Sequence, residues 1–185
     1  MGEPGTKEPL TLEELEATTA VRTGRKHILS ILVENKPGVL TRIAGLFARR
    51  GFNIDTLAVG PTDDPTLSRI TLTLDGAMHP IDQVTKQLHK LVNVLKIRDL
   101  EPEETLAREL ALFKLAVDGT SRAELLQICE IFRAKVVDLA KRSVIVELTG
   151  TTEKVEAFEQ LVRPFGLIEM ARTGEIAISR GRSET

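Results

Sequence analysis

The hydrophobic pattern of this chain passes through one order of strands and helices and then passes through the same order again. In the first half, the run at 28–33 is apolar and rich in β-branched side chains, which predicts a strand. Residues 67–75 alternate apolar and polar side chains, which also predicts a strand, whereas residues 80–91 carry apolar side chains at helical spacing. The elements predicted in this half are strands at 28–33, 53–60, 67–75 and 92–100 and helices between Pro37 and Gly51 and at 80–91.

The second half repeats this order over a similar length. Ser121 is predicted to cap a helix at 123–132, and Glu124, three residues later, completes a capping box. The other elements predicted here are strands at 109–118, 135–140, 143–150 and within 168–179, and a helix at 152–165. The order βαββαβ is that of the ferredoxin-like fold. The expected fold class is therefore α+β, with two ferredoxin-like βαββαβ domains.

The 185 residues divide into four segments on this pattern. Residues 1–24 contain three glycines and two prolines and are expected to form a flexible N-terminal leader. The first domain is expected at 25–100, a charged linker at 101–108, and the second domain at 109–181. A domain of roughly 75 residues buries only about 60% of its unfolded surface, so we expect the two to dock or to oligomerise.

Composition excludes several classes of function. The net charge is −2, and the chain has no Trp or Tyr and only six Phe, so it lacks the basic surface and stacking rings of RNA-binding modules. No apolar run approaches the roughly 18 residues of a membrane span, and the N-terminus lacks the pattern of a secretory signal. The single cysteine, Cys129, rules out an intramolecular disulfide and indicates a reducing compartment. We expect a cytoplasmic protein with no nucleic-acid partner and no membrane partner.

The sequence contains no pattern typical of catalysis or metal binding. An acylphosphatase-like enzyme requires a basic phosphate cradle in the first strand–helix turn, where this chain offers Lys36 but no arginine. His27, His79 and His89 lack the spacing of metal ligands. Cys129 falls on an apolar helix face without an evident base and is predicted to lie in the core. We therefore predict no catalytic residue, no metal site and no cofactor in this chain.

The turn Asn35-Lys36-Pro37-Gly38 joins the first predicted strand to the first predicted helix. One interpretation is an ordinary Pro-Gly connection, with Pro37 in the first turn of the helix. The other is a binding site, because a helix that starts near Gly38 presents unpaired N–H groups and a positive dipole end to a carboxylate. Asn35 can donate and accept hydrogen bonds, and we expect Asn53 to lie near the same turn. Together these groups would hold both charges of an amino acid.

Several longer motifs resemble those of a known family. ENKPGVL, GLFARRGFNI, VGPTDDPTLSR and QLHKLVNVLKI resemble the small regulatory subunit of acetolactate synthase (acetohydroxyacid synthase), whose N-terminal part is an ACT domain. The resemblance continues through EIFRAKVVDL and ISRG, and so covers roughly residues 26–181. It implies a non-catalytic protein that activates a catalytic large subunit carrying thiamine diphosphate, Mg²⁺ and FAD. It also implies feedback inhibition by valine, or by another branched-chain amino acid, in branched-chain amino acid biosynthesis.

The same resemblance implies where an effector binds. In this family two ACT domains pair side by side across a homodimer, and valine binds at their interface. The implied effector-contacting positions are Asn35, Gly38 and Asn53, with the backbone at Val39, Leu40 and Ile54 nearby.

The second half differs from the first at the corresponding turn, where it has Asp118-Gly119-Thr120-Ser121. We therefore predict that the second half binds no valine and serves dimerisation and contact with the catalytic subunit. Two alternatives remain at this stage. One is a free-standing ACT sensor that binds an amino acid but acts on another protein. The other is a small enzyme on the same fold, which the missing catalytic groups disfavour.

Overall fold

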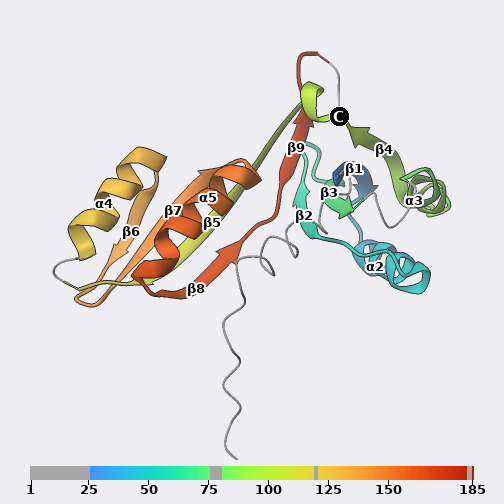
Figure 1. Ribbon diagram of the computed structural model, residues 1–185. Coiled ribbons are helices and arrows are strands. Elements are labelled where there is room, and N and C mark those ends of the chain that lie inside the picture. Colours follow the sequence, from blue (N-terminus) through green and yellow to red (C-terminus); the bar gives the residue numbers. More distant parts are fainter. Residues whose placement is uncertain (1–25, 76–80, 119–120, 183–184) are drawn as a thin grey trace, which may run out of the picture.

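The computed structural model describes residues 26–75, 81–118, 121–182 and 185. These residues form two α+β units, each with two helices packed on an antiparallel sheet (Figure 1). The fold class predicted from the sequence is therefore confirmed. The expectations for the leader at 1–24, for His79 and for Gly119-Thr120 fall outside the described residues.

The N-terminal unit has the predicted order βαββαβ. Its elements are β1 (Lys26–Glu34), α2 (Val39–Arg50), β2 (Thr56–Pro61), β3 (Leu67–Asp75), α3 (Ile81–Leu88) and β4 (Val94–Leu100). The strand order across the sheet is β2-β3-β1-β4, so β2 and β4 are the edges. Gly51 ends α2 in the left-handed conformation (φ 67°), as its position after two arginines predicted.

The central strand β1 is buried on both faces. Leu29 and Ile31 face α2 and α3 and belong to the core of this unit. Ser30, between them, and Thr71, its partner on β3, point to the opposite face, because successive side chains of a strand alternate. Both are buried as well, so another part of the chain covers that face.

The C-terminal unit repeats the order and adds a strand. Its elements are β5 (Thr105–Ala116), α4 (Ser121–Phe132), β6 (Lys135–Leu139), β7 (Ser143–Gly150), α5 (Thr152–Val162), β8 (Leu167–Arg172) and β9 (Ile176–Ser179), with 3-10 turns at Pro102–Glu104 and Arg163–Phe165. The sheet order is β6-β7-β5-β8. Its core contains Phe113 and Phe158, whose ring centroids lie 5.1 Å apart, and Cys129, which is buried as predicted.

Several strand boundaries differ from those predicted. β2 begins at Thr56 rather than at residue 53, so Asn53 precedes the strand. β5 begins at Thr105 rather than at Glu109, because its first four residues pair with β9. The stretch expected to be strand-rich at 168–179 divides into β8 and β9 at Gly174, which has a positive φ of 76° that interrupts an extended chain. Half of the segment expected to be a linker is therefore part of a β-ribbon.

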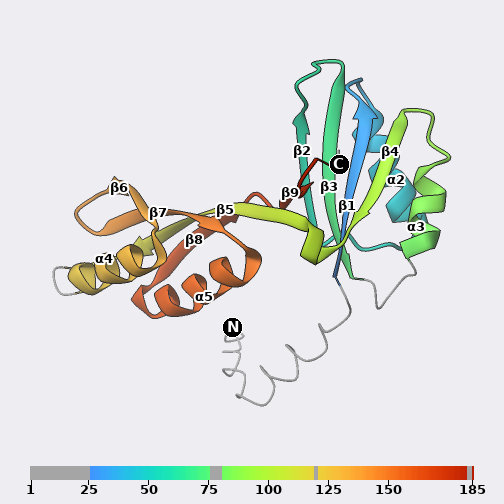
Figure 2. The same cartoon turned by 90° about the horizontal axis from the view of Figure 1, so that it is seen from above.

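This β5–β9 ribbon, residues 105–108 paired with 176–179, connects the two units (Figures 1 and 2). β9 contacts β1 and β4, and Figure 2 shows it crossing the N-terminal sheet on the side away from α2 and α3. Thr105 and Ala177 are buried, whereas Ile176 and Ile178 are exposed. The ribbon thus covers the polar face that carries Ser30 and Thr71.

Candidate effector-binding site

The turn between β1 and α2 is fixed by hydrogen bonds to the β2–β3 hairpin. The backbone N–H of Asn35 donates to the carbonyl of Thr66 (2.7 Å), and its side-chain Nδ2 donates to the carbonyl of Pro65 (3.0 Å). Gly38 has φ 84° and ψ −7°, the left-handed conformation that glycine adopts without strain. An ideal Cβ built on Gly38 meets nothing within 4 Å, so the space above this residue is open.

The helix begins one residue after Gly38, so the expectation that Pro37 occupies its first turn is wrong. The left-handed Gly38 is the N-cap, and its carbonyl accepts the first intrahelical bond, from Arg42 N (3.0 Å). Within α2, all of which the structure describes, no side chain caps the N-terminus and the first turn holds no acidic residue. The N–H of Val39 makes a long hydrogen bond to the carbonyl of Lys36 (3.4 Å), and the helix start is otherwise open to a carboxylate from outside the helix.

Polar side chains from two other segments support this turn. Asn93 donates to Glu34 and accepts a hydrogen bond from Arg42 Nη1 (2.8 Å), so it links the end of β1 to the first turn of α2. The hydrogen bonds of Asn93 and Lys36 hold the pKa of Glu34 below its ordinary value. Sequence reasoning missed this network, because Asn93 is far from the turn in the chain, although it lies within the motif QLHKLVNVLKI.

Asn53 lies in the connection between α2 and β2. Its neighbours Phe52 and Ile54 pack against the core, which leaves the Asn53 side chain exposed. Asn53 Nδ2 donates to Asp55 Oδ1 (2.9 Å), and the N–H of Asp55 donates to the carbonyl of Thr73 on β3 (2.9 Å).

The structure places Asn35 and Asn53 at opposite ends of the sheet, so the expectation that they meet within one chain is wrong. Asn35 follows Glu34, which pairs with Leu67 at the start of β3. Asn53 precedes Thr56, which pairs with Thr73 near the end of β3. The 12 residues of α2 carry the chain back along the sheet by about 18 Å before Asn53 is reached. Within one chain, the positions predicted to contact an effector therefore fall into two separate groups.

Among the described residues, no group of three or more His, Cys, Asp or Glu side chains is placed to hold a metal ion. Within those same ranges, no helix has the length and apolar composition needed to cross a membrane.

The N-terminal βαββαβ unit, whose first helix follows a left-handed glycine, is an ACT domain, and ACT domains define a class of regulatory proteins. A family model described as the AHAS small subunit-like ACT domain matches residues 29–96, and one described as the small subunit of acetolactate synthase matches residues 108–181. The chain belongs to the acetolactate synthase small-subunit family. It is a regulatory, non-catalytic subunit that associates with the catalytic large subunit.

Individual relatives agree along nearly their whole length. The acetolactate synthase small subunit of Mycolicibacterium smegmatis is 48% identical over 155 residues, which are 84% of this chain and 91% of that protein. The probable small subunit of Methanothermobacter thermautotrophicus is 49% identical over 156 residues, or 84% and 93% of the two chains. The crystal structure of the small subunit from Thermotoga maritima superposes with a TM-score of 0.79 at 43% identity and covers 86% of this chain and 99% of its own.

Proposed function

We propose that this subunit raises the activity of acetolactate synthase and makes it sensitive to valine, or to another branched-chain amino acid. The catalytic partner would carry thiamine diphosphate, Mg²⁺ and FAD, and the complex would act in the cytoplasm. The observation that carries the proposal is the open turn at Gly38, where an uncapped helix N-terminus and an oriented carboxamide adjoin. This role requires no catalytic side chain.

The ligand contacts follow from the charges of a free amino acid. The N–H of Leu40 would bind the carboxylate, and the N–H of Val39 would exchange its long bond to the Lys36 carbonyl (3.4 Å) for one to the ligand, with Gly38 allowing close approach. Carboxamide oxygens of Asn35 and Asn53 would accept hydrogen bonds from the ammonium group. Leu40 is 41% exposed and would contact an aliphatic side chain. The backbone of Ile54 adjoins the Asn53 half of the site.

A homodimer would bring these two groups of positions together as two halves of one site. β2 is an edge strand, and its large side chains Leu57 and Val59 are 37% and 48% exposed. An edge strand that pairs antiparallel with its own copy is related to that copy by a two-fold axis perpendicular to the sheet. The Thr56 end of one β2 then lies beside the Pro61 end of the other. The partner subunit's Asn53 would therefore lie at the same end of the joined sheet as Asn35.

The described residues at the start of α4 differ from those at the start of α2 in one respect that supports the prediction of no valine site in the C-terminal unit: a carboxylate of the chain itself lies there. At the start of α4, the Asp118 carboxylate accepts hydrogen bonds from the N–H and the hydroxyl of Ser121, both at 2.8 Å. The chain's own carboxylate thus takes the place that a ligand carboxylate would need. Ser121 is the first residue of α4 that the structure describes, and its hydroxyl also accepts a hydrogen bond from the N–H of Asp118 (3.0 Å). We propose that this unit contributes to dimerisation and to contact with the catalytic subunit.

Regulation would then operate through the dimer. Valine that bridges two protomers would favour an arrangement that activates the catalytic subunit less well. Such coupling is typically about 1–3 kcal/mol and reciprocal, so the catalytic subunit would change the affinity for valine by the same factor.

Reconstitution tests this function directly. The chain is added to the purified catalytic subunit of the same organism, and acetolactate formation is followed with and without valine. We expect activity to rise and valine to suppress the rise. A rise that valine, leucine and isoleucine all leave unchanged would contradict effector binding, and no rise would contradict activation itself.

A further inference from the structure

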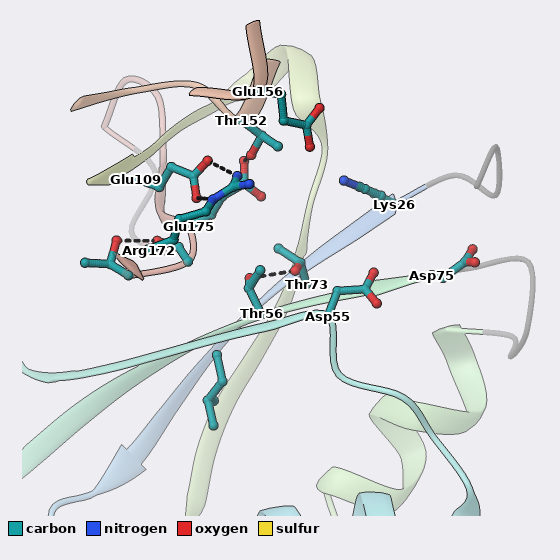
Figure 3. Close-up of a pocket in the computed structure, with 13 residues that line it drawn as sticks. Lys26, Asp55, Thr56, Thr73, Asp75, Glu109, Thr152, Glu156, Arg172 and Glu175 are labelled. Atoms are coloured by element: carbon teal, nitrogen blue, oxygen red, sulfur yellow. Dashed lines mark hydrogen bonds and ion pairs between the residues drawn. The ribbon is translucent and has the colours of Figure 1, made fainter. Parts of the chain in front are cut away.

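The two units meet at a turn that the C-terminal unit holds rigidly. This turn, residues 173–175, joins β8 to β9 and lines a cavity of about 480 Å³ between the units (Figure 3). The hydroxyl of Thr173 accepts from Leu110 N (3.1 Å) and donates to the carbonyl of Gly174 (2.8 Å). Glu175 Oε1 accepts from the hydroxyl of Thr152 (2.9 Å). The turn is thus tied both to β5 and to the start of α5.

The middle residue of this turn touches the N-terminal sheet. Gly174 is buried and has a φ of 76°. An ideal Cβ at Gly174 would lie 2.9 Å from Cβ and 3.3 Å from Oγ1 of Thr56, the first residue of β2. Real Cβ atoms essentially never come so close to another carbon, so only glycine allows this contact.

A short series of contacts leads from Thr56 to Asn53. The hydroxyls of Thr56 and Thr73 are hydrogen-bonded at 2.6 Å, and the carbonyl of Thr73 accepts from Asp55 N at 2.9 Å. Asp55 in turn accepts the hydrogen bond from Asn53 Nδ2. Figure 3 shows Asp55, Thr56 and Thr73 together on the N-terminal side of the cavity.

We infer that Gly174 is a positioning residue for the Asn53 half of the effector site. The turn fixes where β2 begins, and the start of β2 fixes Asp55 and the carboxamide that Asp55 holds. The C-terminal unit thereby takes part in the effector response. The expected effect on valine inhibition rests on the proposed function, whereas the positioning of Asn53 by Gly174 rests on the contacts alone.

The test compares two glycines in the full-length chain reconstituted with the catalytic subunit. Gly174→Ala adds a methyl group against Thr56, whereas Gly181→Ala adds one at nearly the same φ (74°) with nothing within 4 Å. Both variants therefore pay a similar conformational cost for a residue with a Cβ at positive φ, and they differ only in the steric clash with Thr56. Two readouts are taken: the valine concentration for half-inhibition, and the NMR resonance of the Asn53 side-chain amide in the free subunit.

We expect Gly174→Ala to raise the half-inhibitory valine concentration at least about fivefold, to shift the Asn53 resonance and to preserve activation without valine. Gly181→Ala should change neither readout. An unshifted Asn53 resonance in Gly174→Ala, or an equal shift in Gly181→Ala, would overturn the inference. If wild type ignores valine, the proposed function fails, and the Asn53 resonance still decides the positioning role.

A second substitution checks the contact from the other side. Thr56→Gly removes the Cβ that Gly174 approaches, so the double variant Gly174→Ala/Thr56→Gly should bring the Asn53 resonance back toward that of Thr56→Gly alone. Should Gly174→Ala fail to fold, this double variant takes its place. A double variant that folds but whose Asn53 resonance still differs from that of Thr56→Gly alone would count against the inference.

Discussion

At the scale of the residue, Gly38 is required to be glycine because of its backbone conformation and not because a side chain would lack space. Its φ of 84° is strained for any residue with a side chain, although no atom lies where a Cβ would stand. Gly60, on β2, also has open space around its missing Cβ but has no φ in the left-handed region. A comparison of Gly38 with Gly60 therefore isolates the effect of the left-handed conformation from that of steric crowding.

We predict that Gly38→Ala lowers the free energy of unfolding by about 1 kcal/mol, the cost of a left-handed residue with a Cβ. Gly60→Ala should lower it by much less, because only the conformation differs between the two sites. Chemical denaturation of both variants measures the difference. Equal stability of the two variants would show that the left-handed conformation of Gly38 is not required.

Asn53 provides a second test at this scale. Asn53→Ala is expected to raise the valine concentration for half-inhibition about tenfold, because a hydrogen bond to a charged group contributes roughly 1.5–3 kcal/mol. Activation without valine should persist, since the Asn53 side chain is exposed and its neighbours form the core contacts. Gln127→Ala, which removes an exposed carboxamide from α4, is the matched control. Loss of activation in Asn53→Ala would mark Asn53 as structural.

At the scale of the element, the β2 edge determines whether the proposed site can form. Val59→Asp would place a charge among the apolar side chains of a β2–β2 interface, where a buried carboxylate is costly. We predict that this variant sediments as a monomer and loses valine inhibition. Leu95→Asp introduces the same charge at an exposed position of β4, the opposite edge, and should remain dimeric. A dimeric Val59→Asp protein would exclude pairing through β2.

The network that joins β1, α2 and the segment before β4 predicts a pH effect. The pKa of Glu34 is lowered in the folded protein, mainly by Asn93. A lowered pKa stabilises the fold above the ordinary value of 4.5, and this contribution is lost as the pH falls through the folded-state pKa. Asn93→Ala should therefore raise the pKa of Glu34 in an NMR titration and make stability less sensitive to acid. Asp64, whose pKa is lowered by Thr66, is the internal control and should not change.

Sequence reasoning predicted most elements and failed where direction in space matters. Periodicity is local, so the buried side chains of β1 and α2 and the core position of Cys129 could be predicted from the pattern. The position of Asn53 relative to Asn35 was not predicted. The two residues are near each other in the sequence, but α2 runs along the sheet between them and separates them in space. The split of 168–179 at Gly174 was missed, although Gly174 lies in a polar stretch, because the partner of β9 lies about 70 residues earlier and no local pattern reports it.

At the scale of the whole molecule, a buried ion pair lies where the two units face each other. Glu109 of β5 is only 1% exposed, and Arg172 of β8 donates to it through Nε (3.1 Å) and Nη2. Burial alone would lower the pKa of Arg172, but the hydrogen bond and charge of Glu109 outweigh it and raise that pKa. Both side chains line the cavity in Figure 3.

We predict that Arg172→Met lowers the free energy of unfolding by about 3 kcal/mol, because it leaves a buried carboxylate without its partner. The double variant Glu109→Leu/Arg172→Met should recover most of this loss. Lys135→Met, which breaks the exposed pair of Lys135 and Glu147, should cost less than about 1 kcal/mol. Similar losses in both single variants would contradict the difference in burial.

The β5–β9 ribbon also affects the order in which the parts of the subunit fold. Its two strands are separated by the whole C-terminal sheet, so the ribbon cannot close until that sheet has brought β8 back beside β5. Until then, the face of the N-terminal sheet that carries Ser30 and Thr71 stays open to water. The subunit should thus mature in sequence, with two independently nucleated units first and their junction last. The contact that gives the C-terminal unit its influence over Asn53 is, on this schedule, the last to form during folding.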